Sequence, residues 1–323
     1  MKTRSYIAKR AVMIIPQLFI VMIITFSLMH FAPGDPVEMF FGGPEGDAEL
    51  VAQLVEEYGF NKPIWQQFLI WVGKLLHGDL GYSFVTNRPV YRMIMERIGN
   101  TLTLMLTSVV IAIVVGIILG TISAYKQYSF VDNFTRVFVV FGTATPAFWI
   151  GLMAMLVFGV WLGWLPVSGT MSLGILDKSW SVKLTDRIWH MILPVSILSY
   201  RFMATYTRQM RANMLQVLNQ DYIRTARAKG LKEMIVVGKH AMKNAMLPIV
   251  TIIGMSLGTI INGAVIIETI FSWPGIGSLT IQSVLRRDYS VIMAIVLLLG
   301  VMIVFANLLT DIVYSYLDPR IEF

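Results

Sequence analysis

The chain has 323 residues, of which 56% are apolar, and it carries a net charge of +7. A mean hydropathy of +0.69 excludes an ordinary water-soluble globule and predicts an all-α protein that crosses the membrane several times. Without cysteine, neither disulfides nor thiolate metal sites are possible. The four scattered histidines have no paired spacing, so we expect no metal site.

The amino-terminal third predicts one span followed by a large extracytoplasmic region. Residues 11–31 are apolar and follow a basic amino terminus, which places that terminus in the cytoplasm. Residues 32–100 carry more acidic than basic side chains, which places them outside. Here residues 45–58 have a helical pattern, and residues 64–76 predict an amphipathic helix on the outer membrane surface. This helix either forms a docking platform or only covers helix ends.

Five more apolar stretches bring the predicted number of spans to six within one membrane domain, residues 1–323, and return the carboxyl terminus to the cytoplasm. We expect Pro146 to kink the third span. Gly116 and Gly120, like Gly254 and Gly258, have the spacing of close helix contacts, within the chain or against a partner. The five stretches are residues 102–124, 137–164, 191–207, 247–267 and 291–313.

A polar, basic segment, residues 208–246, separates the fourth and fifth predicted spans. Its excess of lysine and arginine is typical of a cytoplasmic loop and explains the positive charge without nucleic acid. Asp221 is a predicted N-cap, residues 222–229 a short helix, and Gly230 its left-handed C-cap. A second helix is predicted at residues 233–247.

The short helix has the composition of a docking element. The small residues Ala226, Ala228 and Gly230 would let a partner surface approach closely. Arg224 and Arg227 would contact water or acidic groups of that partner. Such a helix suits a groove on another protein.

The run DYIRTARAKG from Asp221 to Gly230 resembles the cytoplasmic coupling loop of ABC importer permeases. The general pattern has Glu-Ala-Ala where this chain has Arg224, Thr225 and Ala226, and Gly230 lies further from the closing Leu-Pro pair than usual. Both departures look like the peptide-importing branch. The resemblance extends to the first span, to residues 77–81 and 268–277, and to residues 318–320.

This resemblance implies a permease of the type I ABC importer fold in a bacterial cell membrane, forming half of a path for dipeptides and oligopeptides. It implies a second homologous permease, two ABC ATPase subunits and an external peptide-binding protein as partners. ATP and Mg²⁺ would bind the ATPases, because neither Gly-Lys pair of this chain fits a Walker loop; the chain itself is expected to hold no cofactor and to be no enzyme. The residues implied to contact the ATPase are Asp221, Tyr222, Arg224, Thr225, Ala226, Arg227, Ala228, Gly230 and Leu231.

Residues 268–277 resemble the external loop between the last two spans of the same family. The resemblance implies that they line or cap the outer mouth of the pore, where Gly275 and Gly277 would permit a tight turn. An ordinary interfacial turn anchored by its tryptophan is the alternative. The candidate gate residues are Glu268, Phe271, Trp273, Pro274 and Gly275.

Arg201, inside the predicted fourth span, has three interpretations. It faces the translocation path and helps admit a peptide carboxylate, it extends to the cytoplasmic surface, or it already belongs to the loop.

Two other functions stay open. A nickel importer permease is one, because nickel permeases look like this branch. A self-contained secondary transporter or membrane enzyme is the more distant one, and it would need buried acid or histidine pairs within the spans.

Overall fold

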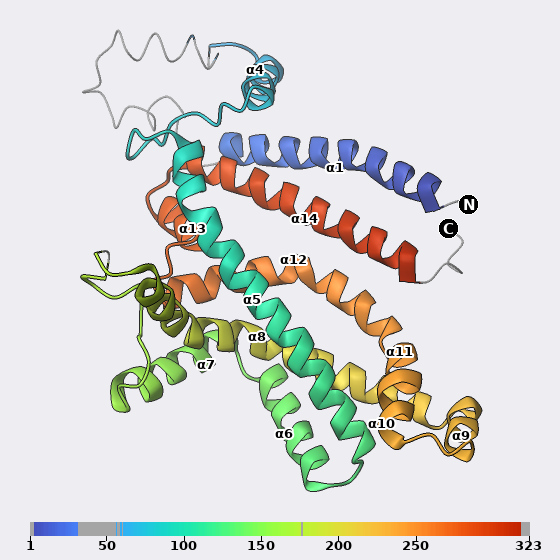
Figure 1. Ribbon diagram of the computed structural model, residues 1–323. Coiled ribbons are helices and arrows are strands. Elements are labelled where there is room, and N and C mark those ends of the chain that lie inside the picture. Colours follow the sequence, from blue (N-terminus) through green and yellow to red (C-terminus); the bar gives the residue numbers. More distant parts are fainter. Residues whose placement is uncertain (1–2, 32–55, 57–58, 60, 176, 318–323) are drawn as a thin grey trace.

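The computed structural model describes residues 3–31, 56, 59, 61–175 and 177–317. Regular structure in these ranges is helical, with one isolated bridge between Tyr82 and Pro89. Long helices lie across one another in a bundle, and short helices gather at its two ends (Figure 1). The elements are α1 (Thr3–Phe31), α4 (Ile64–Leu76), α5 (Val90–Tyr125), α6 (Phe130–Ala144), α7 (Ala147–Ala154), the π-helix η1 (Met155–Trp161), α8 (Trp180–Leu218), α9 (Asp221–Ala228), α10 (Glu233–Ile235), the π-helix η2 (Val236–Ala241), α11 (Met242–Ala245), α12 (Leu247–Ile270), α13 (Ile276–Leu285) and α14 (Tyr289–Leu317).

The described helices fit a protein that crosses the membrane more than once. By length and composition, α5 and residues 289–308 of α14 can each span a bilayer, and the bent pair of α6 with α7–η1 raises the number to three. A shorter apolar segment, Val12–Ser27, lies in α1. The predicted count of six is not confirmed and stays a prediction.

The most extensive contact among the described helices is between α5 and α8, which run in the same direction. A Cβ atom on Gly116 would lie 2.9 Å from the Cβ of Tyr206. One on Gly120 would lie 2.6 Å from the Cβ of Met210 and 2.7 Å from the carbonyl oxygen of Thr207. Both glycines therefore allow close packing within the chain, which resolves the question that the sequence left open for this pair.

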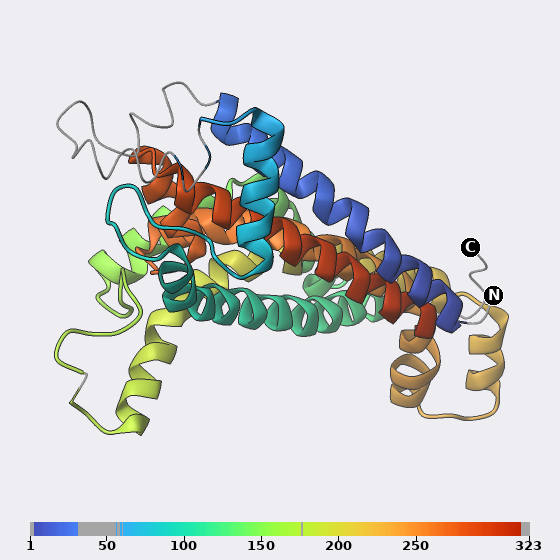
Figure 2. The ribbon, with the colours of Figure 1, turned by 90° about the horizontal axis from the view of Figure 1, so that it is seen from above.

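The carboxyl-terminal helices also pack closely at glycine residues. Gly254 of α12 faces Thr310 of α14 so closely that a Cβ atom would overlap its side chain. Gly300 of α14 would contact Val21 of α1 in the same way. In both views α1 and α14 lie side by side (Figures 1 and 2).

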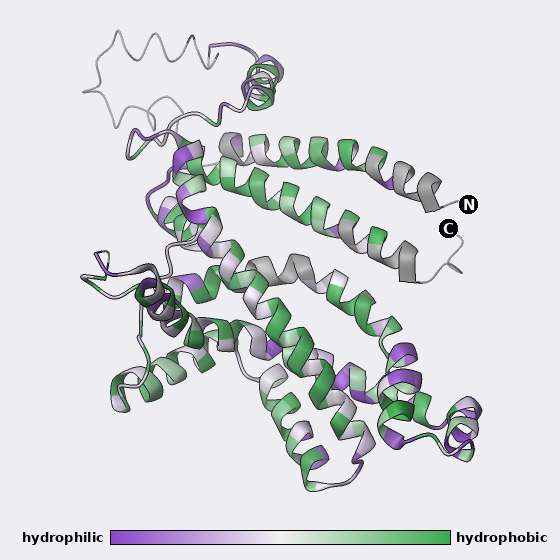
Figure 3. Cartoon of the chain, in the orientation of Figure 1, coloured by the Kyte–Doolittle hydropathy of each residue, from purple (hydrophilic) through white to green (hydrophobic). Residues whose placement is uncertain are grey.

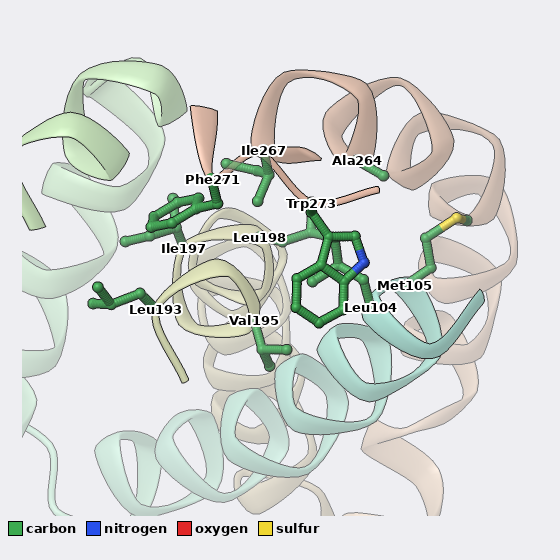
Figure 4. Packing of buried hydrophobic residues seen from close by; sticks show 10 residues of the cluster. All are labelled: Leu104, Met105, Leu193, Val195, Ile197, Leu198, Ala264, Ile267, Phe271 and Trp273. Carbon is green, nitrogen blue, oxygen red and sulfur yellow. The ribbon is translucent and has the colours of Figure 1, made fainter. Parts of the chain in front are cut away.

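A buried apolar cluster joins α5, α8 and α12 below the turn that follows α12. Figure 4 shows Trp273 and Phe271 pointing inward among the aliphatic side chains of these helices. Burial of this apolar surface holds the turn against the bundle. The buried members are Leu104, Met105, Leu193, Val195, Ile197, Leu198, Ala264, Ile267, Phe271 and Trp273.

The predicted third span, residues 137–164, is not one kinked helix. Helix α6 already begins at Phe130, between the second and third predicted spans, and ends at Ala144. Helices α7 and η1 then continue at an angle of 107° to α6. Thr145 and Pro146 are extended, because proline has no amide hydrogen to continue the helix and disfavours helical geometry in the residue before it. The prediction of a kink was therefore wrong: the chain breaks and turns.

Helix α8 runs well past both ends of the predicted fourth span, residues 191–207. It begins at Trp180, between the third and fourth predicted spans, and continues to Leu218, within the basic segment. Its first and last turns carry polar and charged residues, so the apolar pattern alone does not mark them as part of the helix.

The helix predicted at residues 64–76 is present as α4, which packs on the carboxyl-terminal part of α1. The rings of Phe68 and Phe26 lie 5.3 Å apart, and a nitrogen of His30 lies 3.2 Å from the side-chain oxygen of Gln67. The helix predicted at residues 45–58 lies outside the described residues, apart from Glu56.

Different segments of the chain lie at the two ends of the bundle. The start of α1, the end of α14 and the α9–α11 segment lie at one end, while α4 and α13 lie at the other (Figures 1 and 2). Polar residues concentrate at both ends, and apolar residues occupy the helices between them (Figure 3).

Replacing Gly120 with leucine should destabilise the bundle, because the added side chain would have to displace the backbone of α8. We expect a loss of about 1–3 kcal/mol or more, as for other overpacked sites. Thermal unfolding of the purified protein in detergent measures it. Gly99→Ala is the control on the same helix, because nothing lies within 4 Å of its added Cβ. Equal stability of the two variants would contradict the close contact.

Candidate functional site: a helical hairpin at one end and a buried turn at the other

Helix α9 begins one residue earlier than predicted. Gln220, with extended backbone, precedes the helix, and Asp221 is its first residue. The side chain of Asp221 is 96% exposed and caps no amide, so its prediction as the N-cap was wrong. Its carboxylate still lies in the first turn, where a negative charge is favourable toward the helix dipole.

The end of α9 follows the prediction. Gly230 has a φ of +74°, and its amide donates to the carbonyl oxygen of Arg227 at 2.9 Å. The amide of Leu231 donates to the carbonyl oxygen of Ala226 at 3.4 Å, which completes a Schellman motif. Because nothing lies within 4 Å of a Cβ placed on Gly230, this position needs glycine for its backbone angle rather than for space.

One face of α9 is buried against the rest of the chain. Ile223 is fully buried and Ala226 is 7% exposed, in a cluster with Met210 and Met214 of α8 and Ile249 of α12. Ala226 is therefore covered by its own chain, and the prediction that it lets a partner approach is corrected. Burial of this face ties the orientation of α9 to that of α8.

Polar contacts close α9, α10 and α11 into a hairpin. The guanidinium of Arg227 donates to the carboxylate of Glu233 at 2.7 Å, and this hydrogen bond holds the pKa of Glu233 below its usual value. The side-chain amide of Asn244 donates to the hydroxyl of Tyr222 at 2.7 Å. The helix predicted at residues 233–247 is interrupted by the π-helix η2 and ends before Leu247, where α12 begins.

The opposite face of the hairpin is exposed. It combines cations such as Arg224 with apolar side chains, and Met234, 86% exposed, was not among the predicted residues. Ile235 is 41% exposed beside it. Exposed apolar side chains in a region this polar are typical of a protein contact surface. The predicted residues that lie exposed are Asp221, Tyr222, Arg224, Thr225, Arg227, Ala228, Gly230 and Leu231.

At the other end of the bundle, Glu268 lies in the last turn of α12 rather than in a loop. Its fully buried carboxylate accepts hydrogen bonds from the hydroxyl of Thr101 at 2.6 Å and from the amide of Ser278 at 3.0 Å. Gly275 passes so close to this carboxylate that a Cβ atom would overlap it. The glycine is therefore required by the approach of the backbone to Glu268.

The turn after α12 is fixed to α5. The indole nitrogen of Trp273 donates to the backbone oxygen of Asn100 at 3.1 Å, and the side-chain amide of Asn100 donates to the backbone oxygen of Pro274 at 2.9 Å. Phe271 and Trp273 are buried within the chain, as Figure 4 shows. These two side chains thus anchor the turn, and their place in the core agrees with anchoring rather than with lining an open path.

Arg201 is not part of this turn. It lies in the middle of α8, with its side chain exposed, so the predicted gate residues do not form one cluster. The interpretation that Arg201 belongs to a loop was wrong, because α8 continues for several turns beyond it.

Comparison with known proteins then decides the family. Residues 112–323 match the family described as binding-protein-dependent transport system inner membrane component, and residues 3–105 match the amino-terminal model of such components. The chain belongs to this permease family. It is a multi-pass membrane transport component and not an enzyme, which confirms the predicted resemblance.

Relatives of the permease match over almost their whole length. It is 43% identical over 320 residues to the oligopeptide transport system permease protein AppB of Bacillus subtilis, covering 99% of each chain. It is 40% identical over 334 residues to the dipeptide transport system permease protein DppB of Escherichia coli K12, covering 98% of each. The glutathione transport system permease protein GsiC of Escherichia coli O6:H1 is 38% identical over 319 residues, with 99% of each covered.

The permease also contains a buried charge cluster that the sequence analysis missed. The fully buried carboxylate of Asp132 in α6 accepts from Arg211 of α8 at 2.7 and 2.9 Å, from Arg136 at 2.6 Å and from Ser123 of α5 at 2.6 Å. The available signal was Ser129 followed three residues later by an acid, a pattern of helix starts. The cluster joins three helices close to the hairpin.

Replacing Asp132 with alanine should destabilise the permease strongly, because Arg211 would lose its carboxylate partner in a partly buried site. Breaking a buried ion pair in this way costs about 3–5 kcal/mol. Glu96→Ala is the matched control, since Glu96 pairs with Arg88 at 2.6 Å on the exposed surface, where such pairs contribute about 0–1 kcal/mol. Thermal unfolding of both variants checks the difference, and similar midpoints would refute the structural role of Asp132.

Proposed function

We propose that the chain is the permease subunit of an ATP-driven ABC importer and forms half of the translocation path for dipeptides or oligopeptides. The names of its full-length relatives, two of them peptide permeases and one a glutathione permease, support this substrate class and favour it over nickel. An external peptide-binding protein would deliver the substrate.

The observation that carries the proposal is the form of α9. It is a short helix at one end of a membrane domain, with Ile223 and Ala226 buried on the chain's own core and the opposite face exposed. A helix of this kind is suited to docking in a groove of a separate subunit. In this proposal the subunit is an ABC ATPase, and the docking residues are the exposed members of the predicted set together with Met234.

The proposed topology has six spans: α1, α5, the bent pair α6 with α7–η1, α8, α12 and α14. The start of α1 and the end of α14 lie at the same end as α9, which is consistent with both termini in the cytoplasm (Figure 1). The concentration of lysine and arginine in residues 208–246 supports the same orientation. The turn after α12 would then lie at the outer surface.

The partners in this proposal are a second, homologous permease that completes the path and two ATPases that hold ATP and Mg²⁺. ATP-driven closure of the ATPases would move α9. Because α9 is buried against α8, and α8 is locked to α5 and α6, these helices would move as one body. The permease would thus be the two-state element whose equilibrium the ATPases shift.

Replacing Ala228 with tryptophan tests the docking face without touching the chain's own core, since Ala228 is exposed. We expect normal accumulation in the membrane but a loss of ATP-dependent peptide uptake of about fivefold to 150-fold, because overpacking a close contact costs about 1–3 kcal/mol. Uptake and ATPase co-purification are measured together in reconstituted complexes.

The control is Gln127→Trp, at an exposed turn of the same end. It should leave both measurements unchanged. If the Ala228 variant retained the ATPase and its peptide-stimulated hydrolysis, the docking role of α9 would be rejected.

A further inference from the structure

The further inference concerns a cationic stripe on α8, formed by Arg201 and Arg208. Both side chains are exposed, and their spacing of two helical turns, with Thr205 between them, places them on one face. The hydroxyl of Thr205 donates to the backbone oxygen of Arg201 at 3.1 Å. Because the Thr205 hydroxyl already donates within the helix, the two guanidinium groups are the side-chain donors of the stripe that can bind an anion.

The contacts between α5 and α8 give the depth of Arg201. Gly116 packs against the backbone of Met203, and Gly120 against the backbone of Thr207. Because the two helices run in the same direction, Arg201 lies at about the level of Ile113. This is the middle of the apolar run at residues 102–124, so Arg201 lies near the middle of the hydrocarbon layer in the proposed topology.

A guanidinium at this depth is costly if lipid surrounds it, by about 2.5–3.5 kcal/mol on insertion scales. Half of a hydrocarbon layer of about 30 Å is too far for an arginine side chain to reach the polar surface. Among the residues that the structure describes, no carboxylate forms an ion pair with Arg201 or Arg208. Water in a path through the membrane is the environment that accommodates such a charge.

We propose that Arg201 binds the carboxylate end of a peptide midway through the membrane and that Arg208, roughly 10 Å further along the helix, receives it next. The assignment rests on the proposed function. Arginine suits this task because its fork of donors binds a carboxylate in two places and keeps its charge. Lipid phosphate is not the anion, because headgroups do not reach this depth.

The test compares a free carboxylate with its neutral amide. Complexes containing the wild-type permease or Arg201→Gln are reconstituted in vesicles, and transport of alanyl-alanine and of alanyl-alanine amide is measured at equal loading of the peptide-binding protein. We expect the wild type to prefer the free acid. Arg201→Gln should lower acid transport about tenfold or more, the effect of losing a hydrogen bond to a charged group, and leave amide transport unchanged.

Two control variants distinguish the loss of the Arg201 charge from a structural effect of the substitution. Arg201→Lys should keep part of the preference for the acid, and Lys183→Gln, at the outer end of the same helix, should keep all of it. A wild type that carries acid and amide equally, or an Arg201→Gln variant that keeps the preference, would overturn the inference.

Loss of the second permease from purified Arg201→Gln complexes would also overturn it, because Arg201 would then contact that subunit. A wild type that carries neither peptide would contradict the proposed function instead.

Discussion

The close packing of α5 on α8 is the constraint on which the rest of the structure depends. Gly116 and Gly120 bring the two backbones together and fix which residues of the helices lie at the same depth. That register brings Ser123 and Arg211 to one buried carboxylate at the end near the hairpin. At the other end, the same helix α5 presents Thr101 to Glu268.

Helix α5 thereby connects the two ends of the permease. Its final turns share the charge cluster with α8, on whose continuation α9 is packed, and its first half holds the turn after α12 through Asn100 and Thr101. Helix α9 is held by buried apolar side chains, and the hydrogen bonds at the two ends of α5 are buried or partly buried. Under the proposed function, these contacts would carry a displacement of the hairpin to the turn after α12. Packed interfaces of this type respond by switching arrangement rather than by stretching.

The sequence predicted those features that depend on neighbouring residues. The apolar runs located the main helices, and Gly230 correctly marked the end of α9, because a left-handed residue after a helix is a local signal. Long-range pairing escaped prediction: Asp132 and Arg211 lie 79 positions apart, and nothing in either stretch indicates the other. The burial of Ala226 was missed for the same reason, since only the folded α8 shows which face of α9 it covers.

The buried carboxylates of the permease and the exposed Arg201 differ in how their charges are accommodated. Asp132, Glu268 and Asp288 are buried near helix ends, and hydrogen bonds satisfy each carboxylate, including one from Ser83 to Asp288. A buried charge is tolerated only on that condition. Arg201 has the opposite character, because it is exposed in the middle of a helix whose neighbouring faces are packed. In the proposed topology Arg201 lies at mid-depth, and no described carboxylate forms an ion pair with it. This contrast favours a role for Arg201 toward the transported molecule.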